Sequence, residues 1–340
     1  MINNQYKLTS PLLIERQCEN IDLNKKGHVI VKPTYLSICK ADMRYYFGQR
    51  NAEVLKQRLP MVLIHEACGE VIFDPENKLP KHTKVVLLPN IGGKDTFYLE
   101  NYRLDSVFRS SKADGFMQEM ISMDYEHIVP YSKPGSDSVF SFTEFISVGV
   151  HAVNSFLASS HSRRDNICVF GDGALAYVVC SILKNKLKGC KVTVMGINPV
   201  KLQYFNFVDE VINISRRRNF KTYDHAFECV GGSASGTAVN QIIDIIAPQG
   251  TVMLLGVSEE NVALNTRMIL EKGLTLMGRS RSGREDFVEA VSLMEKNKAF
   301  ASRMKQLISA QVEVNSVNDI VRGFDLAKTS DFKVVLHWCV

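Results

Sequence analysis

Short apolar runs alternate with amphipathic stretches through the middle of the chain. Runs of four to six mostly apolar residues occur at 167–170, 191–195, 211–214, 225–230, 251–255 and 274–277. Between them, 174–186 and 239–246 carry apolar side chains on one face and are predicted helices. Short strands separated by helical segments are typical of parallel βαβ units, and near-continuous apolar runs fit strands covered on both faces. The pattern predicts a doubly wound α/β domain over 149–283.

The two ends of the chain have a different pattern. Residues 1–148 contain short strand-like runs at 29–31, 69–73 and 84–88, with turns between them and little helical signal. Residues 284–340 combine amphipathic helical stretches at 287–295 and 316–326 with a strand-like run at 333–336. We expect a β-rich domain formed by 1–148 together with 284–340, because a strand that follows such an α/β domain often returns to the first domain.

Composition narrows the class of protein. The chain has 340 residues, of which 45% are hydrophobic and 23% charged, as in ordinary globular proteins. This balance argues against a disordered chain, a collagen or a small disulfide scaffold. No apolar run is long enough to span a membrane, and the first residues lack a signal-type stretch, so we expect a cytoplasmic protein. The net charge of +5 is mostly dispersed, which disfavours nucleic-acid binding but suits a small anionic ligand.

A glycine-rich turn follows the first predicted strand of the α/β domain. Its pattern is Gly171-x-Gly173-x-x-Ala176, between a strand and a helix. The glycines allow a tight turn and close approach of a pyrophosphate, the small alanine allows helix–strand packing, and the helix N-terminus offers free N–H groups. We expect a dinucleotide to bind Gly171, Asp172, Gly173, Ala174, Leu175 and Ala176. The alternative is a glycine turn without a ligand.

The end of the second strand indicates which dinucleotide binds. Enzymes specific for NAD usually have an acidic residue there, whereas this chain has Gly196, followed by Asn198 and Lys201. The missing carboxylate removes repulsion of a 2′-phosphate, which favours NADP(H). The alternative is that Lys201 is only a solvated helix residue. The ends of the fourth and fifth strands, Cys229-Val230 and Gly256-Val257, are expected near the nicotinamide.

Several possible metal ligands lie in the β-rich part. They are Cys39 with Asp42, His65 with Glu66, and Glu144. Each is ordinary alone, because a lone cysteine is usually buried in a core and a His-Glu pair is usually at a surface. Together they supply a thiolate, an imidazole and carboxylates, the ligand types that zinc accepts.

The order of these motifs resembles that of the zinc-dependent medium-chain alcohol and polyol dehydrogenases. The segments are Cys39 to Asp42, Leu63 to Val71, Asp114 to Glu119, Thr143 to Ala152 and the Gly171 loop. The resemblance implies a GroES-like β-rich catalytic domain into which a Rossmann domain is inserted. It also implies Cys39, His65 and Glu144 around a catalytic zinc, Glu66 as a ligand or exchanging neighbour, and Asp42 orienting a ligand.

Further segments are similar to the ribulose-5-phosphate reductases. They are 42–50, 59–66, 224–232 and 270–283. This resemblance implies NADPH-dependent reduction of D-ribulose 5-phosphate to D-ribitol 5-phosphate, which feeds CDP-ribitol for wall teichoic acid or capsule. It also implies a ribitol-5-phosphate cytidylyltransferase as functional partner, and a homodimer joined at the edges of two Rossmann sheets.

Three departures from the wider family bear on the site. No cysteine lies between Cys68 and Cys168, so we expect one catalytic zinc and no structural zinc. Ile64 replaces the usual glycine before the His-Glu pair. Ala41 replaces a hydroxyl residue in the usual proton path, which leaves water, Glu66 or Tyr45 as possible relays.

A phosphorylated substrate requires cationic donors. Arg44 and Arg109 are the first candidates and Lys112 a further one, because arginine binds two phosphate oxygens at once and these residues lie near the predicted metal ligands or in the loop that replaces the structural-zinc lobe. Arg279, Arg281 and Arg284, after the sixth strand, are additional candidates. For each residue the alternative is a solvated charge. Two other functions remain open, an NAD-dependent polyol or sugar-alcohol dehydrogenase and a non-catalytic NADPH-binding redox sensor; the intact ligand set argues against the sensor.

Overall fold

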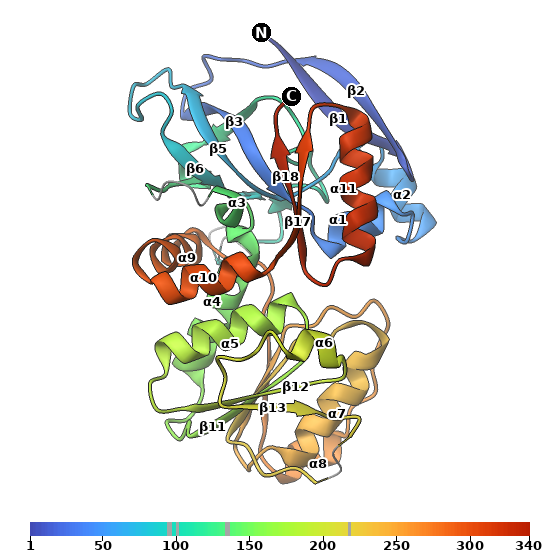
Figure 1. Cartoon of the computed structure of the whole chain (residues 1–340), viewed down its shortest axis with the longest axis vertical. Helices are drawn as coiled ribbons and strands as arrows, with labels where there is room; N and C mark the ends of the chain where they lie inside the picture. The colour runs from blue at the N-terminus through green and yellow to red at the C-terminus, as the bar shows by residue number, and fades with distance from the viewer. Residues whose placement is uncertain (94–96, 100–101, 133–136, 217–218) are drawn as a thin grey trace. The chain divides into compact units, whose positions relative to one another are not determined.

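The structure is a computed structural model that describes residues 1–93, 97–99, 102–132, 137–216 and 219–340. The chain forms two compact units (Figure 1). The first consists of Met1–Ser147 and Ser282–Val340, and the second of Val148–Arg281. Helix α4 (Thr143–Ser159) begins in the first unit and continues into the second.

The first unit is built on β-sheets. Its largest sheet has the order β10 (Ile128–Pro130), β6 (Lys84–Leu87), β5 (Glu66–Phe73), β3 (His28–Ser37), β18 (Lys333–Trp338) and β17 (Ile308–Val314), with β9 (Ile121–Asp124) also paired to β3. A smaller sheet has the order β2 (Leu13–Asn20), β1 (Ile2–Ser10) and β4 (Met61–Val62). Strands β7 (Asn90–Ile91) and β8 (Val107–Phe108) form a third pair.

Helices cover these sheets and connect them. They are α1 (Lys40–Tyr46), α2 (Ala52–Arg58), α3 (Asp137–Phe140), α9 (Arg284–Lys296), α10 (Lys298–Gln306), α11 (Val317–Thr329) and the 3₁₀ turn η2 (Tyr125–His127). Helix α11 packs on β17 and β18, and the buried rings of Tyr46 and Phe324 stack at 4.3 Å between α1 and α11. The C-terminal segment therefore shares one apolar core with the N-terminal one.

The second unit is a parallel sheet with helical connections. Its strand order is β13 (Glu210–Asn213), β12 (Lys191–Gly196), β11 (Asn166–Phe170), β14 (His225–Glu228), β15 (Thr251–Leu254) and β16 (Thr275–Gly278). Its helices are α5 (Ala174–Lys186), α6 (Pro199–Leu202), the 3₁₀ turn η3 (Gly232–Ala234), α7 (Ser235–Ile245) and α8 (Thr266–Glu271). The chain moves outward from β11 in both directions, so right-handed crossovers put α5 and α7 on opposite faces of the sheet (Figure 1). The carboxyl ends of β11 and β14 then form the switch point at which such sheets bind ligands.

The predicted fold class is confirmed. All six strand runs of the α/β domain are strands, and the predicted helix at 174–186 has those bounds in α5. The predicted strand at 333–336 is part of β18, which pairs antiparallel with β3 of the first segment. Strand β17 was not predicted, although its residues alternate between apolar and polar along the strand and three of them are exposed. Helix α4 was not predicted either, although Glu144, Ser147, His151 and Asn154 recur at a spacing of three or four residues.

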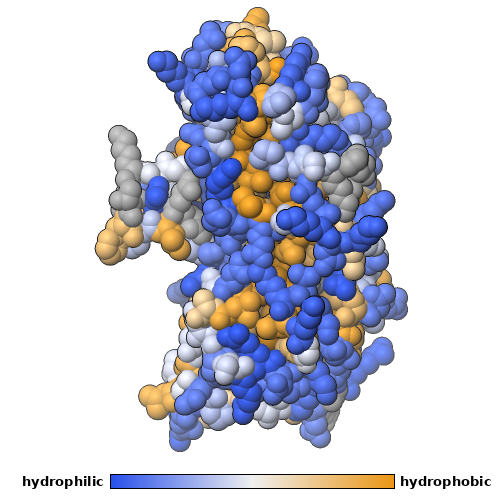
Figure 2. Space-filling model, turned by 90° about the vertical axis from the view of Figure 1, so that its left-hand side faces the viewer, coloured by the Kyte–Doolittle hydropathy of each residue, from blue (hydrophilic) through white to orange (hydrophobic). Residues whose placement is uncertain are grey.

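Within the described residues, no helix is both long and apolar enough to cross a membrane. On the face shown in Figure 2, hydrophilic side chains predominate and apolar ones are exposed among them.

Candidate active site

The predicted metal ligands come together in the first unit. Cys39 caps the N-terminus of α1, His65 immediately precedes β5, and Glu144 lies in the first turn of α4. Donor atoms of Cys39, Asp42 and His65 all lie within 4.8 Å of one another, and so do those of His65, Glu66 and Glu144. His65 belongs to both groups, so one imidazole connects the thiol to the carboxylates.

Asp42 fixes the orientation of His65. Its buried carboxylate lies 3.2 Å from Nδ1 of His65 and accepts the N–H groups of Ile64 and Cys39, each at 3.1 Å. Burial alone would raise the pKa of Asp42, but His65 and these hydrogen bonds hold it below its ordinary value. With Nδ1 engaged, Nε2 is the nitrogen left for a metal.

Ser110 is part of this arrangement and was not predicted from the sequence. Its hydroxyl donates a 2.6 Å hydrogen bond to Asp42, and its backbone has a positive φ of 58°. Two residues before Ser110, Phe108 at the end of β8 places its ring 5.3 Å from the His65 ring. The end of β8 and the turn that follows it therefore support His65, directly through Phe108 and indirectly through Ser110 and Asp42.

Lys333 is the second residue that the sequence reasoning missed. Its Nζ lies 2.5 and 2.7 Å from the two carboxylate oxygens of Glu66, and both side chains are buried. Ser37 of β3 pairs with Glu66 of β5 on one side and with Val335 of β18 on the other, which brings the start of β18 to this site. The only sequence signal was a lysine opening the predicted closing strand.

The charges of the cluster suit a bound dication. Lys333 pairs with the Glu66 carboxylate, while the buried Glu144 makes no ion pair among the described residues. Burial raises the pKa of Glu144 to about 7 against the attraction of His65, and the Glu66 carboxylate adds to the rise. Sulfur, imidazole and carboxylate donors at such spacing form a set that zinc accepts, so the residues present fit the implied metal.

The structure shows the surroundings of Ile64 and of the two candidate proton relays, Tyr45 and Glu66. Ile64 adopts a φ of 67°, the left-handed region where glycine is usual, and its N–H is held by Asp42. The conformation costs roughly 1–2 kcal/mol for a residue with a Cβ atom, which the fully buried side chain offsets by packing. Tyr45 lies in the apolar core of the unit, and Glu66 is engaged by Lys333. These positions favour structural roles for both candidate relays.

In the second unit, the glycine turn has the form that a dinucleotide requires. Gly171 has a φ of 126°, and a Cβ there would lie 3.0 Å from the carbonyl oxygen of Cys229. Nothing lies within 4 Å of a Cβ built on Gly173, the N-cap of α5, so the space beside the helix N-terminus is open. Ala176 is fully buried. The turn thus fits a pyrophosphate at the N-terminus of α5.

The position of the Asp172 side chain accounts for the glycine at the end of β12, Gly196. Asp172 accepts hydrogen bonds of 2.8 Å from the N–H groups of Ile197 and Asn198. A Cβ on Gly196 would lie 2.7 Å from this side chain, so the strand cannot end in the acidic residue typical of NAD enzymes. Asn198 caps the short helix α6, which contains Lys201.

Glu228 joins the two loops expected near the nicotinamide. Its buried carboxylate accepts the N–H groups of Val230 at 2.8 Å, Gly231 at 2.9 Å and Gly256 at 3.0 Å. A Cβ on Gly256 would lie 2.3 Å from the Gly231 nitrogen, so the close approach of the loops requires glycine. Cys229 is buried and Val257 is exposed. The sequence did not single out Glu228.

Three of the predicted phosphate residues have different surroundings. Arg44 lies in the last turn of α1. The Arg109 guanidinium donates to the carbonyl of Asp114 and lies over the Phe116 ring, and burial lowers the pKa of Arg109 to about 10. Lys112 is exposed and lines a pocket. Lys112 is therefore the most accessible of the three to a ligand.

The fold and the donor cluster together are those of a zinc-binding dehydrogenase, and comparison with known families gives the same class. Residues 25–133 match the alcohol dehydrogenase GroES-like domain, and residues 175–296 match the zinc-binding dehydrogenase family. The chain is 42% identical to the ribulose-5-phosphate reductase of Streptococcus pneumoniae, over 99% of this chain and 98% of that one. It is 43% identical to ribulose-5-phosphate reductase 1 of Staphylococcus aureus, over 99% of each.

A solved structure gives the same result. The crystal structure of S. aureus TarJ in complex with NADPH superimposes with a TM-score of 0.89 at 40% identity, covering 100% of both chains. The chain therefore belongs to the ribulose-5-phosphate reductase family of zinc-binding dehydrogenases.

Proposed function

We propose that this chain catalyses the NADPH-dependent reduction of D-ribulose 5-phosphate to D-ribitol 5-phosphate. The observation that carries the proposal is that four relatives, 41–43% identical over 99–100% of this chain, all bear the name ribulose-5-phosphate reductase. The buried donor set around His65 supports it, because that set distinguishes an enzyme from a protein that only binds a nucleotide.

The residues of the first unit would hold and orient one zinc ion. Cys39, His65 and Glu144 would be its ligands, with Asp42 fixing the His65 ring and Lys333 holding Glu66 close by. Zinc would act as a Lewis acid on the ketone oxygen, and NADPH would supply the hydride that reaches carbon 2. The ligand side chains are buried or half-buried, which limits competing water and strengthens their electrostatic effect. One proton must reach the product oxygen, and with Ala41 in place of a hydroxyl we propose that water delivers it.

NADPH would bind along the carboxyl edge of the second unit's sheet. The pyrophosphate would lie on 171–176, with the 2′-phosphate near Gly196, Asn198 and Lys201. The nicotinamide would lie against Cys229, Val230, Gly256 and Val257, the loops that Glu228 joins. The NADPH complex of S. aureus TarJ supports this choice of cofactor.

The direct test is NADPH oxidation by the purified zinc-loaded protein with D-ribulose 5-phosphate, followed by its absorbance. Cys39→Ala should abolish turnover while the circular dichroism spectrum stays that of the wild type. Full removal of the metal should do the same, reversibly. Turnover that survives complete metal removal would contradict the role of zinc.

The two alternative functions predict other results. An NAD-dependent polyol or sugar-alcohol dehydrogenase would turn over sorbitol with NAD faster than ribulose 5-phosphate with NADPH. A non-catalytic redox sensor would bind NADPH, contain no zinc by metal analysis and turn over no ketose.

The product and the assembly complete the proposal. D-ribitol 5-phosphate would pass to a ribitol-5-phosphate cytidylyltransferase that makes CDP-ribitol for wall teichoic acid or capsule. Two copies would pair through β16, an edge strand whose Leu276 and Met277 are half-buried. A molar mass of one chain by light scattering would exclude the dimer.

A further inference from the structure

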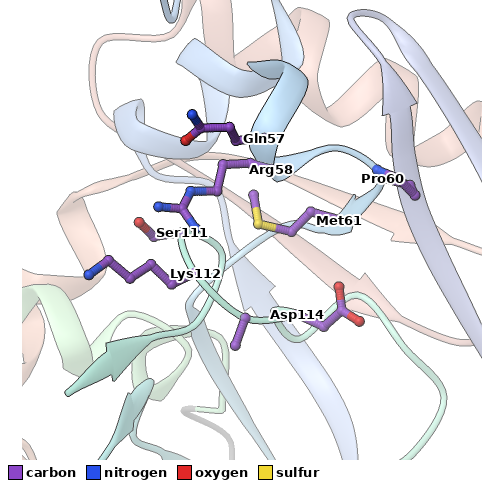
Figure 3. Close-up of a pocket in the computed structure, with 8 residues that line it drawn as sticks. Gln57, Arg58, Pro60, Met61, Ser111, Lys112 and Asp114 are labelled. Carbon is purple, nitrogen blue, oxygen red and sulfur yellow. The ribbon is translucent and has the colours of Figure 1, made fainter. Parts of the chain in front are cut away.

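A pocket of about 240 Å³ lies in the first unit, beside the end of α2 (Figure 3). Its lining comes from two segments, Gln57, Arg58, Pro60 and Met61 on one side and Ser111, Lys112, Ala113 and Asp114 on the other. In Figure 3 the Arg58 guanidinium lies beside Ser111, Lys112 extends toward the same side, and Met61 forms an apolar wall. Two cations and two neutral polar side chains thus border one concave surface.

Among the described residues, the polar donors that line this pocket have no partner within the protein. The side chains of Gln57, Arg58, Ser111 and Lys112 make no hydrogen bond or ion pair within the part of the chain that the structure describes. The acid on the lining, Asp114, is engaged elsewhere, because it accepts the N–H of Val62 at 2.8 Å and lies 3.6 Å from Lys7. Its carboxylate points away from Arg58 in Figure 3. The pocket therefore has unneutralised positive charge.

Both lining segments lead directly into the metal site. Met61 begins β4, which ends at Val62, and the chain then continues through Leu63 and Ile64 to His65. Ser111 follows Ser110, whose hydroxyl donates to Asp42, and Phe108 at the end of β8 lies against the His65 ring. An anion in the pocket would thus lie beside the two segments that position His65.

We propose that this pocket is the subsite for the substrate's phosphate, with Arg58 as its principal ligand and Lys112 and Ser111 as supporting donors. The inference rests on the proposed function and deepens it, because it says what selects a ketose phosphate over the free ketose. Arginine presents two parallel N–H groups to a phosphate dianion, lysine adds a point charge, and Met61 suits the carbon chain. Arg58 thereby takes the role that the sequence assigned to Arg44 and Arg109.

The test compares Arg58→Gln with Lys56→Gln, an exposed cation on the same helix outside the pocket. KM and kcat are measured with D-ribulose 5-phosphate and with unphosphorylated D-ribulose, and inorganic phosphate serves as a competitive inhibitor. Loss of a charge-assisted pair predicts a KM for ribulose 5-phosphate raised about 10- to 100-fold in Arg58→Gln, with kcat nearly unchanged. The inhibition constant of phosphate should rise in parallel, while kinetics with ribulose stay as in the wild type. Lys112→Gln should show a smaller effect of the same kind, and Lys56→Gln none.

The outcomes separate the two proposals. Wild-type protein that leaves ribulose 5-phosphate unreduced contradicts the proposed function, and the phosphate subsite with it. Active wild type with an unchanged KM in Arg58→Gln overturns only the subsite. Equal losses with ribulose and ribulose 5-phosphate also overturn it, because a phosphate ligand cannot affect a substrate without a phosphate.

Discussion

Lys333 holds both carboxylate oxygens of Glu66, at 2.5 and 2.7 Å, although 267 residues separate the two along the chain. The pair is buried next to a second carboxylate, Glu144, in the cluster suited to zinc. Burial opposes a charged lysine, but Glu66 more than compensates and holds the pKa of Lys333 above its ordinary value. The ammonium therefore remains positive and fixes one acid of the site.

Replacing Lys333 should destabilise the metal-free protein more than the zinc-loaded protein. Lys333→Met leaves the buried Glu66 carboxylate without its cation, and breaking a buried pair costs about 3–5 kcal/mol of the free energy of unfolding. With saturating zinc the loss of stability should be smaller, because the dication compensates the unpaired carboxylate charge. Urea unfolding with and without zinc measures both values. Lys333→Arg is the matched control and should retain most of the stability; equal losses in the two metal states would contradict the electrostatic explanation.

Ser110 should contribute to zinc binding without touching the metal. Ser110→Ala removes a 2.6 Å hydrogen bond to Asp42, so Asp42 holds the His65 ring less firmly. Partners of metal ligands typically contribute about 10- to 100-fold to affinity, and we expect roughly 10-fold for this single bond. Competition with a chromophoric chelator gives the zinc dissociation constant. Ser111→Ala, on the neighbouring pocket residue, should leave that constant unchanged; a similar drop in both variants would point to general loosening of the turn after β8.

Glu228 should determine how tightly NADPH binds. Glu228→Gln keeps the size of the side chain, but it leaves one oxygen acceptor and places an NH₂ group against backbone N–H groups. Losing charge-assisted bonds worth about 1.5–3 kcal/mol should weaken NADPH binding about 10- to 100-fold. Fluorescence titration with NADPH measures the dissociation constant. The control is Glu271→Gln on α8, whose ion pair with Arg267 is exposed, and it should bind like the wild type.

His225 should make the second unit sensitive to acid. Its Nδ1 accepts the N–H of Thr251 at 3.1 Å and its Nε2 donates to the carbonyl of Arg163 at 3.0 Å, so a second proton has no acceptor. Burial lowers the pKa of His225 to about 4, and the neighbouring His161 and Arg164 act in the same direction, while Asp224 opposes them.

The sign of the effect follows from proton uptake. Between pH 6.5 and about 4 the unfolded chain binds a proton at His225 that the folded chain does not. Stability is therefore fully present above pH 6.5 and falls as the pH decreases through this window, by about 2 kcal/mol after allowance for solvent screening. Urea unfolding between pH 7 and pH 4 measures this slope. His225→Gln can make both hydrogen bonds without titrating, so it should flatten the slope; an unchanged slope would assign the acid sensitivity to other groups.

The sequence alone predicted the parts of the fold that local patterns specify. Apolar runs separated by amphipathic helices defined the parallel sheet, and the spacing of Gly171, Gly173 and Ala176 within that pattern predicted the dinucleotide turn. The residue types of Cys39, His65 and Glu144, together with the family resemblance, brought three distant segments into one expected metal site. These features could be predicted because each depends on side-chain period, turn chemistry or donor type.

Only the tertiary structure brought Lys333 to Glu66, Ser110 to Asp42 and Glu228 to the loop at Gly256. The same holds for the pocket at Arg58, which needs the end of α2 and the turn after β8 to lie side by side. A lysine or serine has the same appearance in a sequence whether it is solvated or buried against a carboxylate. The physical reason is that strand pairing and loop packing decide which distant groups meet. Burial then decides how strongly their charges and hydrogen bonds contribute to stability and binding.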